Sequence, residues 1–139
     1  MRKILVVEDD PKIRTALTIR LKSIGYEVVT AGDGFTGLKM TMTHRPSLIL
    51  LDIMMPVGMG FSVAERLHDI GLGEIPIIFI TASKRAGLRK TAQRLGAAGF
   101  FEKPYDAEEL LAAVNLILGQ PALPVASQSS SGPPARPNP

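Results

Sequence analysis

The chain has 139 residues, of which 45% are hydrophobic, so it is long enough for one domain with its own core. It contains no cysteine, which excludes disulfides and thiolate metal sites, and no apolar run approaches the roughly 20 residues of a membrane-spanning helix. The net charge of +3 permits an acidic partner but does not by itself indicate nucleic-acid binding. The apolar run at residues 4–7 is too short for a signal peptide, so we expect a cytoplasmic protein without membrane contact.

Strands and helices are expected to alternate along the chain. Short, mostly apolar runs predict strands at residues 4–7, 26–30, 48–51, 77–80 and 99–102, and the unbroken runs among them suit strands buried on both faces. The segments that follow these strands carry apolar residues at helical spacing and end at a glycine or before a proline. Five repeats of strand and helix indicate an α/β fold, with a doubly wound parallel sheet and helices on both faces.

Several helix features can be assigned from individual residues. Asp10 followed by Pro11 suits an N-cap and a first helical turn, so we interpret Asp10 as a cap rather than as a metal ligand. Asp106 is expected to cap the last helix, with Glu108 and Glu109 favourably placed in its first turn. The buried face of the second helix is expected to consist of its large apolar residues, which are Phe35, Leu38 and Met42.

The C-terminal segment differs from the rest of the chain in composition. Residues 120–139 contain six prolines, four serines and a single charged residue, Arg136. Such a segment cannot bury enough apolar surface to offset the entropy of ordering it. We therefore predict one domain over residues 1–119 and a disordered Pro/Ser-rich tail or linker over residues 120–139.

The central stretch of the chain is the apolar run 48–51, which leads directly into Asp52. Pro56, Gly58 and Gly60 are expected to form a loop, so Asp52 should lie at the carboxyl end of a buried strand, where the chemistry of open parallel sheets is found. Other strands also lead into polar residues, and their ends converge at the same edge of the sheet. The residues concerned are Glu8, Asp9, Thr81 and Lys103.

The three carboxylates expected at this edge repel one another when all are ionised. Two like charges about 4 Å apart cost roughly 4 kcal/mol at an effective dielectric constant near 20. Either their pKa values rise or a cation lies among them, and oxygen ligands without histidine or cysteine favour Mg²⁺ or Mn²⁺. With the Thr81 hydroxyl and the Lys103 ammonium on the opposite side, the set could bind a phosphoryl group on an Asp52 oxygen.

Together these residues resemble a known family, the receiver domain of two-component response regulators, over residues 1 to about 119. The resemblance implies a flavodoxin-like, CheY-like fold with five helices and strand order 2-1-3-4-5. It also implies a switch in a phosphorelay, in which Asp52 accepts a phosphoryl group from a sensor histidine kinase or a histidine phosphotransfer protein. The motifs that carry the resemblance are Glu8-Asp9, Leu51-Asp52-Ile53-Met54-Met55-Pro56, Gly60, Thr81-Ala82 and Lys103-Pro104-Tyr105.

The resemblance assigns metal ligands to this chain. It implies that Mg²⁺ or Mn²⁺ is held by Asp9, by Asp52 and by the backbone carbonyl of Met54, with Glu8 acting through water. A protein of this kind is not a metabolic enzyme, because it catalyses only its own phosphorylation and dephosphorylation.

The resemblance also assigns the moving parts of a switch. Lys103 is expected to contact the phosphoryl oxygens, next to a Lys103–Pro104 bond that is often cis in the family. Thr81 is expected to move toward the phosphoryl group, and Phe100 to move inward into the space that Thr81 leaves. The surface made by the fourth helix, the last strand and the last helix would then control a partner or an output domain.

A run of basic residues marks the helix expected near residues 88–95, and no acid lies between Glu74 and Glu102. One interpretation is a solvated helix face. The other is a docking surface for an acidic downstream protein, or for a homodimer that pairs this helix with the acidic start of the last helix. Ala98 and Gly99 stand where many winged-helix DNA-binding regulators carry acids, so we expect a chain outside that subfamily, with no direct nucleic-acid binding by this domain. The basic residues are Lys84, Arg85, Arg89, Lys90 and Arg94.

Two other functions on the same fold remain open. A Mg²⁺-dependent aspartyl phosphohydrolase would have a similar site, but such enzymes usually carry a second Asp two residues after the nucleophile, where this chain has Met54. A flavin or nucleotide binder needs a glycine- or hydroxyl-rich phosphate loop after the first strand, and the three acids at residues 8–10 would repel a phosphate there.

Overall fold

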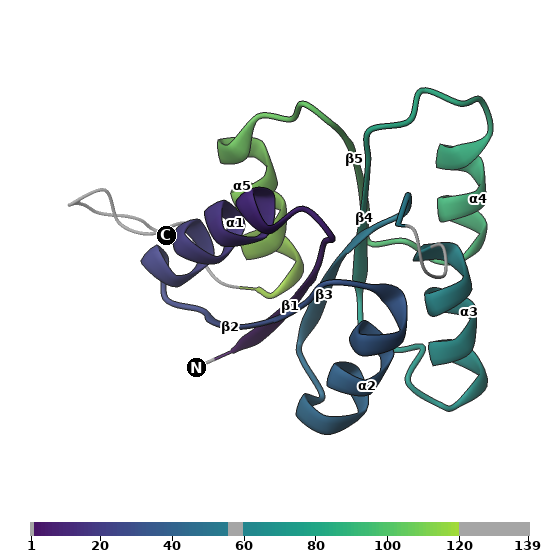
Figure 1. Cartoon of the computed structure of the whole chain (residues 1–139), viewed down its shortest axis with the longest axis horizontal. Coiled ribbons are helices and arrows are strands. Elements are labelled where there is room, and N and C mark those ends of the chain that lie inside the picture. The colour runs from purple at the N-terminus through teal and green to yellow at the C-terminus, as the bar shows by residue number, and fades with distance from the viewer. Residues whose placement is uncertain (1, 56–59, 120–139) are drawn as a thin grey trace, which may run out of the picture.

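The computed structural model describes residues 2–55 and 60–119, which form one five-stranded parallel sheet with helices on both faces (Figure 1). The strand order is β2-β1-β3-β4-β5, which confirms the predicted fold class and topology. Pro56 of the quoted motif and the tail predicted over residues 120–139 lie outside the described residues. The strands are β1 (Lys3–Val7), β2 (Glu27–Ala31), β3 (Leu48–Asp52), β4 (Ile77–Thr81) and β5 (Gly99–Glu102). The helices are α1 (Pro11–Ser23), α2 (Gly34–His44), α3 (Gly60–Asp69), α4 (Leu88–Arg94) and α5 (Ala107–Ile117).

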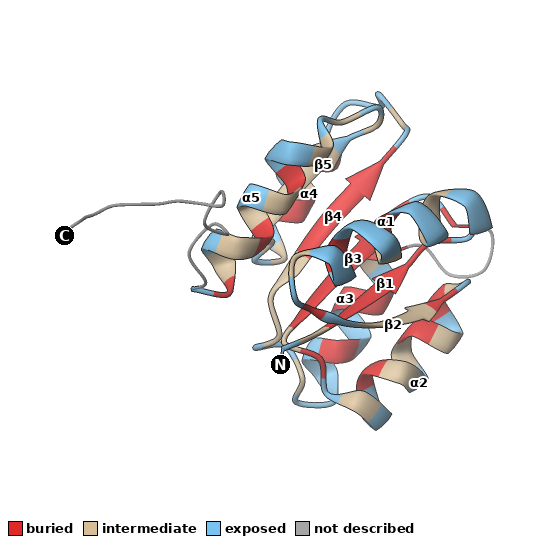
Figure 2. Ribbon diagram, turned by 90° about the vertical axis from the view of Figure 1, so that its left-hand side faces the viewer, coloured by how far each residue is buried: buried red, intermediate tan, exposed pale blue. Residues whose placement is uncertain are grey.

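The sheet separates two hydrophobic cores. α1 and α5 cover one face, and α2, α3 and α4 cover the other (Figure 1). Ile4 and Val6 of β1 belong to the first core, whereas the alternate residues Leu5 and Val7 belong to the second. Figure 2 shows the central strands buried along almost their whole length, which is why unbroken apolar runs predicted them.

The predicted buried face of α2 is wrong at two of its three residues, Phe35 and Met42. Phe35 is 65% exposed and Met42 is 44% exposed, while Leu38 is half-buried against the core. α2 approaches β1 so closely that a Cβ on Gly37 would lie 3.0 Å from a Val7 methyl group. Small residues therefore make the closest contact with β1, Leu38 and Met40 are partly buried against the core, and Phe35 and Met42 are exposed. The buried residues of α2 are Gly34, Gly37 and Thr41.

The predicted helix caps are confirmed. The Asp10 carboxylate accepts a hydrogen bond from the Lys12 backbone N–H at 2.8 Å and caps α1. Asp106 caps α5 by accepting from the N–H groups of Glu108 and Glu109. Within residues 2–55 and 60–119, every helix is too short or too polar to cross a membrane.

Candidate functional site

The carboxyl ends of four strands meet at one edge of the sheet, and the polar residues singled out in the sequence lie there. Glu8 and Asp9 follow β1, and Asp52 ends β3. Thr81 ends β4, and Lys103 follows β5. Ligand oxygens of Glu8, Asp9 and Asp52 all lie within 4.8 Å of one another. The fold therefore brings the three carboxylates together in a cluster, which we call the acid cluster.

Lys103 contacts two members of the acid cluster directly. Its Nζ donates hydrogen bonds to Glu8 Oε1 at 2.9 Å and to Asp52 Oδ2 at 3.0 Å. The side chains of Glu8 and Asp52 are only 3% and 5% exposed, and that of Lys103 is 18% exposed. These ion pairs are therefore shielded from water, and each partner depends on the others to compensate its buried charge.

Burial is the main influence on the pKa of the Glu8 carboxyl. Desolvation raises this pKa, the hydrogen bonds from Lys103 and from the Asp10 N–H lower it, and the charge of Asp52 raises it again, with a net increase above the ordinary value. Burial alone would lower the pKa of Lys103, but its hydrogen bonds to Glu8 and Asp52 raise it above the ordinary value. The raised pKa of Glu8 therefore reflects mainly its burial, and the raised pKa of Lys103 reflects its two carboxylate partners.

Backbone amides orient Asp52 and Thr81. The Met54 N–H donates to Asp52 Oδ1 at 2.9 Å, so the two oxygens of Asp52 have different partners. The buried Thr81 hydroxyl oxygen accepts from the Ser83 N–H at 3.0 Å, at the beginning of the loop that leads to α4. Both functional groups are thus held in defined orientations by the loops that follow their strands.

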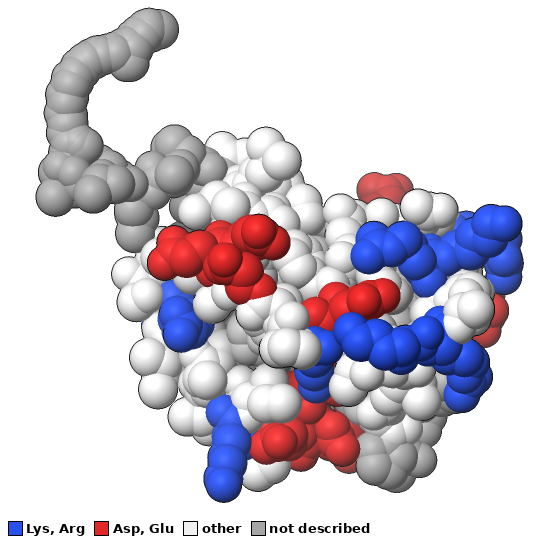
Figure 3. All heavy atoms as spheres, turned by 90° about the horizontal axis from the view of Figure 1, so that it is seen from above, with Lys and Arg blue, Asp and Glu red and all other residues white. Residues whose placement is uncertain are grey.

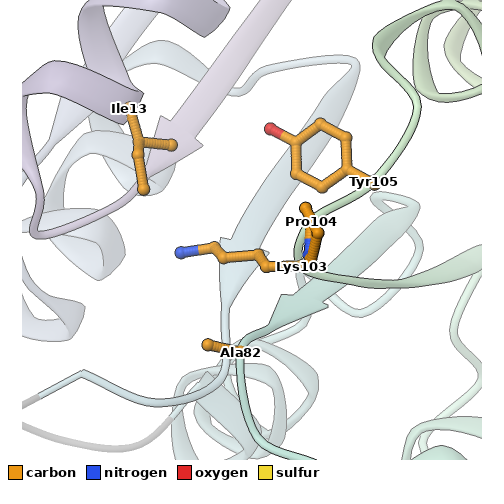
Figure 4. Close-up of a pocket in the computed structure, with 5 residues that line it drawn as sticks. All are labelled: Ile13, Ala82, Lys103, Pro104 and Tyr105. Atoms are coloured by element: carbon orange, nitrogen blue, oxygen red, sulfur yellow. The ribbon is translucent and has the colours of Figure 1, made fainter.

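A cavity of about 520 Å³ lies beside Lys103. It is lined by Ile13 of α1, by Ala82 after β4, and by Lys103, Pro104 and Tyr105 of the loop between β5 and α5 (Figure 4). The Lys103–Pro104 bond is cis, as the resemblance implied. In Figure 4 the Lys103 ammonium extends from this loop toward the space below Ile13, with the Tyr105 ring across the cavity. A group that approaches Lys103 from solvent therefore meets a largely apolar wall.

Phe100 of β5 lies half-buried against the core on the α2–α4 side of the sheet. The guanidinium carbon of Arg89 on α4 lies 4.6 Å from the centroid of the Phe100 ring. This is the geometry of a cation–π contact, typically about 0.5–1 kcal/mol at an exposed site. The predicted movement of Phe100 stays a prediction. Such a movement would change the contact between Phe100 and Arg89 of α4.

Arg14 is a residue of this site that the sequence reasoning missed. Its Nη1 donates a hydrogen bond to the Glu8 backbone carbonyl at 2.7 Å. Arg14 follows the cap residue Asp10 by four positions, which is the spacing that places a side chain back over the preceding loop. That spacing is the signal that could have identified it.

The acid cluster suits a hard divalent cation. Its ligand atoms are carboxylate oxygens of Glu8, Asp9 and Asp52, the donor type that Mg²⁺ and Mn²⁺ prefer. Two of the three side chains are buried and share a single ammonium, so their negative charge is incompletely balanced. Met54 lies in the loop beside Asp52, and the use of its carbonyl as a further ligand stays a prediction.

Comparison with known proteins points to one family. The family model of the response regulator receiver domain matches residues 4–115. A probable transcriptional regulator ycf27 from Cyanophora paradoxa is 40% identical over 130 residues, which cover 94% of this chain and 54% of that protein. The chain spans about half the length of the curated relatives that it matches. These relatives are named as transcriptional regulators, and the expectation from Ala98 and Gly99 that the chain lies outside the winged-helix subfamily stays a prediction.

Solved structures show the same fold. The receiver domain of the Francisella response regulator 1452 has a TM-score of 0.80 at 26% identity, covering 86% of this chain and 98% of that one. The receiver domain of the sensor histidine kinase PA1611 from Pseudomonas aeruginosa PAO1 has a TM-score of 0.76 at 30% identity, again covering 86% and 98%. That structure holds a magnesium ion coordinated in its active site cleft. The sequence motifs, the fold and these matches together show that the chain belongs to the response regulator receiver domain family.

Proposed function

We propose that this domain is a phosphoacceptor switch, in which Asp52 takes a phosphoryl group from a phosphohistidine of a sensor histidine kinase or a histidine phosphotransfer protein. The observation that carries the proposal is the convergence of the acid cluster and Lys103 on Asp52 at one edge of the sheet. An Asp52 carboxylate oxygen attacks the phosphorus, and the new O–P bond forms as the P–N bond breaks. The imidazole leaves with the electron pair of that bond and is then protonated.

The contacts of Asp52 suit it to this role. Met54 N–H fixes one carboxylate oxygen and Lys103 the other, so the nucleophile is oriented before the donor arrives. The Lys103 ammonium, 3.0 Å from Asp52 Oδ2, is close enough to transfer its hydrogen bond to a phosphoryl oxygen bound there. Glu8, Asp9, Asp52 and the Met54 carbonyl would hold Mg²⁺ or Mn²⁺, which when bound offsets the negative charge of the phosphoryl oxygens.

The proposed switch uses Thr81 and Phe100, whose present contacts would change. On phosphorylation the Thr81 hydroxyl leaves the Ser83 N–H and donates to a phosphoryl oxygen, and Phe100 moves inward, away from Arg89. A change from 1% to 99% active requires about 5.5 kcal/mol of differential stabilisation. Hydrogen bonds to charged groups contribute roughly 1.5–3 kcal/mol each, so contacts from Thr81 and Lys103 to one phosphoryl group could supply most of this.

The surface that reports this change is the exposed face of α4 and the neighbouring β5 and α5. Figure 3, which looks onto the edge where the strands end, shows basic side chains gathered on the α4 side. The partner is a downstream protein with an acidic surface, or a second copy that offers the acidic start of α5. Nucleic acid is not expected to bind this domain directly, and a cytoplasmic location suits a partner of histidine kinases. The exposed basic residues are Lys84, Arg85, Arg89, Lys90 and Arg94.

The test is phosphorylation of the purified chain with acetyl phosphate in the presence and absence of Mg²⁺. We expect one phosphoryl group per chain that hydroxylamine removes, as from an acyl phosphate, formed only with the metal, and its loss in Asp52→Asn. Asp69→Asn, an exposed residue at the end of α3, is the matched control and should be labelled normally. Steady hydrolysis of added phosphate esters would instead indicate the aspartyl phosphohydrolase. A chain that is not labelled and does not hydrolyse phosphate esters would contradict both functions.

A further inference from the structure

We propose that Arg14 is a positioning residue for the acid cluster. It holds the loop between β1 and α1, residues 8–10, in the conformation that brings Glu8 and Asp9 to Asp52. The inference rests on the proposed function of the acid cluster, because positioning matters only where a cation and a phosphoryl group are to be bound.

Arg14 bridges two loops at the edge of the sheet. Its Nη1 donates to the Glu8 carbonyl at 2.7 Å, a short, charge-assisted hydrogen bond. The same nitrogen lies against the loop that follows β2, where a Cβ on Gly32 would be only 3.4 Å from it. The guanidinium of Arg14, a half-buried residue, therefore lies between the loop that carries the acids and the loop that carries Gly32.

Arg14 fixes the part of Glu8 that its other contacts leave free. The Glu8 N–H donates to the Ala31 carbonyl at 3.0 Å, which anchors the residue to β2. Its carboxylate is held by the Asp10 N–H and by Lys103. Neither contact determines the plane of the peptide group between Glu8 and Asp9, to which the Glu8 carbonyl belongs. By holding that carbonyl, Arg14 sets the direction in which the Asp9 side chain leaves the backbone.

Asp9 depends on this restraint more than the other two acids do. Glu8 and Asp52 are buried and share Lys103, whereas Asp9 is exposed. Within residues 2–55 and 60–119, its carboxylate accepts no hydrogen bond that would orient it. The orientation of the peptide group is then the main influence that keeps the Asp9 oxygens within 4.8 Å of the others.

Charge and positioning predict opposite effects when Arg14 is removed. A nearby positive charge repels a divalent cation, so loss of the guanidinium by itself would tighten Mg²⁺ binding. Loss of a positioning contact would weaken it, and removal of such outer contacts in metal sites typically costs about 10–100-fold in affinity. The sign of the change therefore separates the two roles without any measurement of phosphorylation.

The experiment is titration of Mg²⁺ into the unphosphorylated chain by isothermal calorimetry. We expect Arg14→Gln to raise the Mg²⁺ dissociation constant about 10-fold. Arg14→Lys, which keeps the charge and one donor, should be intermediate, and it replaces the Gln variant should the latter not fold. Arg20→Gln makes the same change at an exposed position of the same helix and should leave the dissociation constant unchanged.

A second readout needs no metal. The Asp10 amide, whose hydrogen bond to Glu8 Oε2 closes the same loop, should exchange its hydrogen faster in Arg14→Gln than in wild type and in Arg20→Gln. Unchanged or tighter Mg²⁺ binding together with unchanged exchange would overturn the role of Arg14, with the proposed function intact. A wild-type chain that binds no Mg²⁺ would instead overturn the proposed function, and faster exchange in Arg14→Gln would then still support Arg14 as the residue that holds the loop.

Discussion

Lys103 joins groups from three strands of the sheet, and its contacts link the stability of the domain to its chemistry. It follows β5 and donates hydrogen bonds to Glu8 beyond β1 and to Asp52 of β3. Removal of one partner from a buried ion pair typically costs about 3–5 kcal/mol, because it leaves an uncompensated buried charge. Under the proposed function, the same ammonium would also contact a phosphoryl oxygen.

Lys103→Met, which keeps most of the side-chain length without the charge, should lower the free energy of unfolding by about 2 kcal/mol near pH 7. This is less than for a fully buried pair, because the Lys103 side chain itself is partly exposed. Burial already raises the pKa of Glu8, and the variant loses the ammonium that lowers it. A carboxyl with a raised pKa in the folded state contributes stability at low pH that is lost as the pH rises through that pKa. The difference in unfolding free energy between Lys103→Met and the wild type should therefore become smaller as the pH falls toward 4.5, the ordinary pKa of a glutamate. Urea unfolding at several pH values measures this difference.

Lys84→Met provides the matched control for this prediction. The Lys84 ammonium lies 3.4 Å from Glu102 Oε1, but both side chains are exposed. Exposed pairs of this kind contribute about 0–1 kcal/mol, so the control should unfold almost as the wild type does at every pH. A deficit in Lys103→Met that stayed constant with pH would show that lost packing, rather than unpaired carboxylates, explains it.

Among the elements, the start of α3 packs directly on the end of β3. The Gly60 N–H donates to the Ile53 carbonyl at 2.9 Å, and a Cβ on Gly60 would lie 2.7 Å from the Asp52 carbonyl oxygen and 2.9 Å from the Ile53 Cα. These are backbone atoms, which cannot rotate out of the way. Gly60, which we expected in a loop, is thus the first residue of α3 and allows the helix to approach the backbone of Asp52.

Gly60→Ala should move α3 or the backbone of Asp52, because the added methyl group overlaps the Asp52 carbonyl. We expect a loss of about 1–3 kcal/mol in the free energy of unfolding, as for other overpacked sites, and slower labelling of Asp52 by acetyl phosphate. Gly37→Ala is the comparison, since its methyl group would meet the Val7 side chain and alanine also favours the helix by about 1 kcal/mol. Gly37→Ala should be nearly neutral, and wild-type stability and labelling in Gly60→Ala would contradict the proposed packing.

In the molecule as a whole, the sequence predicted those features in which the local residue pattern matches the position of the element in the fold. The unbroken apolar runs 4–7, 48–51 and 77–80 lie within β1, β3 and β4 because these central strands are covered on both faces and have no solvent side to leave polar. The meeting of Glu8, Asp9, Asp52, Thr81 and Lys103 at one edge follows from parallel strands alone, without knowledge of any side-chain contact.

The features that the sequence did not predict depend on distances between backbones. Large apolar residues at helical spacing suggested the wrong face of α2, because the helix lies so close to β1 that only Gly37 and similar small residues fit between them. The hydrogen bond from Arg14 to the Glu8 carbonyl likewise requires the position of a backbone oxygen in a loop. Periodicity describes which side chains are apolar, but it does not give the separation of the elements that carry them.

The charged surface suggests how whole molecules meet. The exposed residues Arg89 and Lys90 of α4 and the acids Glu108 and Glu109 of α5 offer opposite charges, so two copies could pair α4 with α5 across an interface. We expect the chain phosphorylated with acetyl phosphate to self-associate, and Arg89→Glu with Lys90→Glu to weaken that association at least about 10-fold, as measured by sedimentation equilibrium. Lys90→Glu alone should show part of the effect without disturbing the contact of Arg89 with Phe100.

Two further variants decide whether this effect comes from pairing or from net charge. Arg20→Glu with Lys22→Glu changes the net charge equally at the end of α1, on the opposite face of the sheet, and should leave self-association unchanged. Glu108→Lys with Glu109→Lys, added to the α4 variant, should restore association, because the two surfaces again carry opposite charges. If the charge reversal on α1 weakened self-association as much as the charge reversal on α4, a specific interface would be contradicted. A phosphorylated wild type that stays monomeric would exclude the homodimer and leave an acidic downstream protein as the partner of α4.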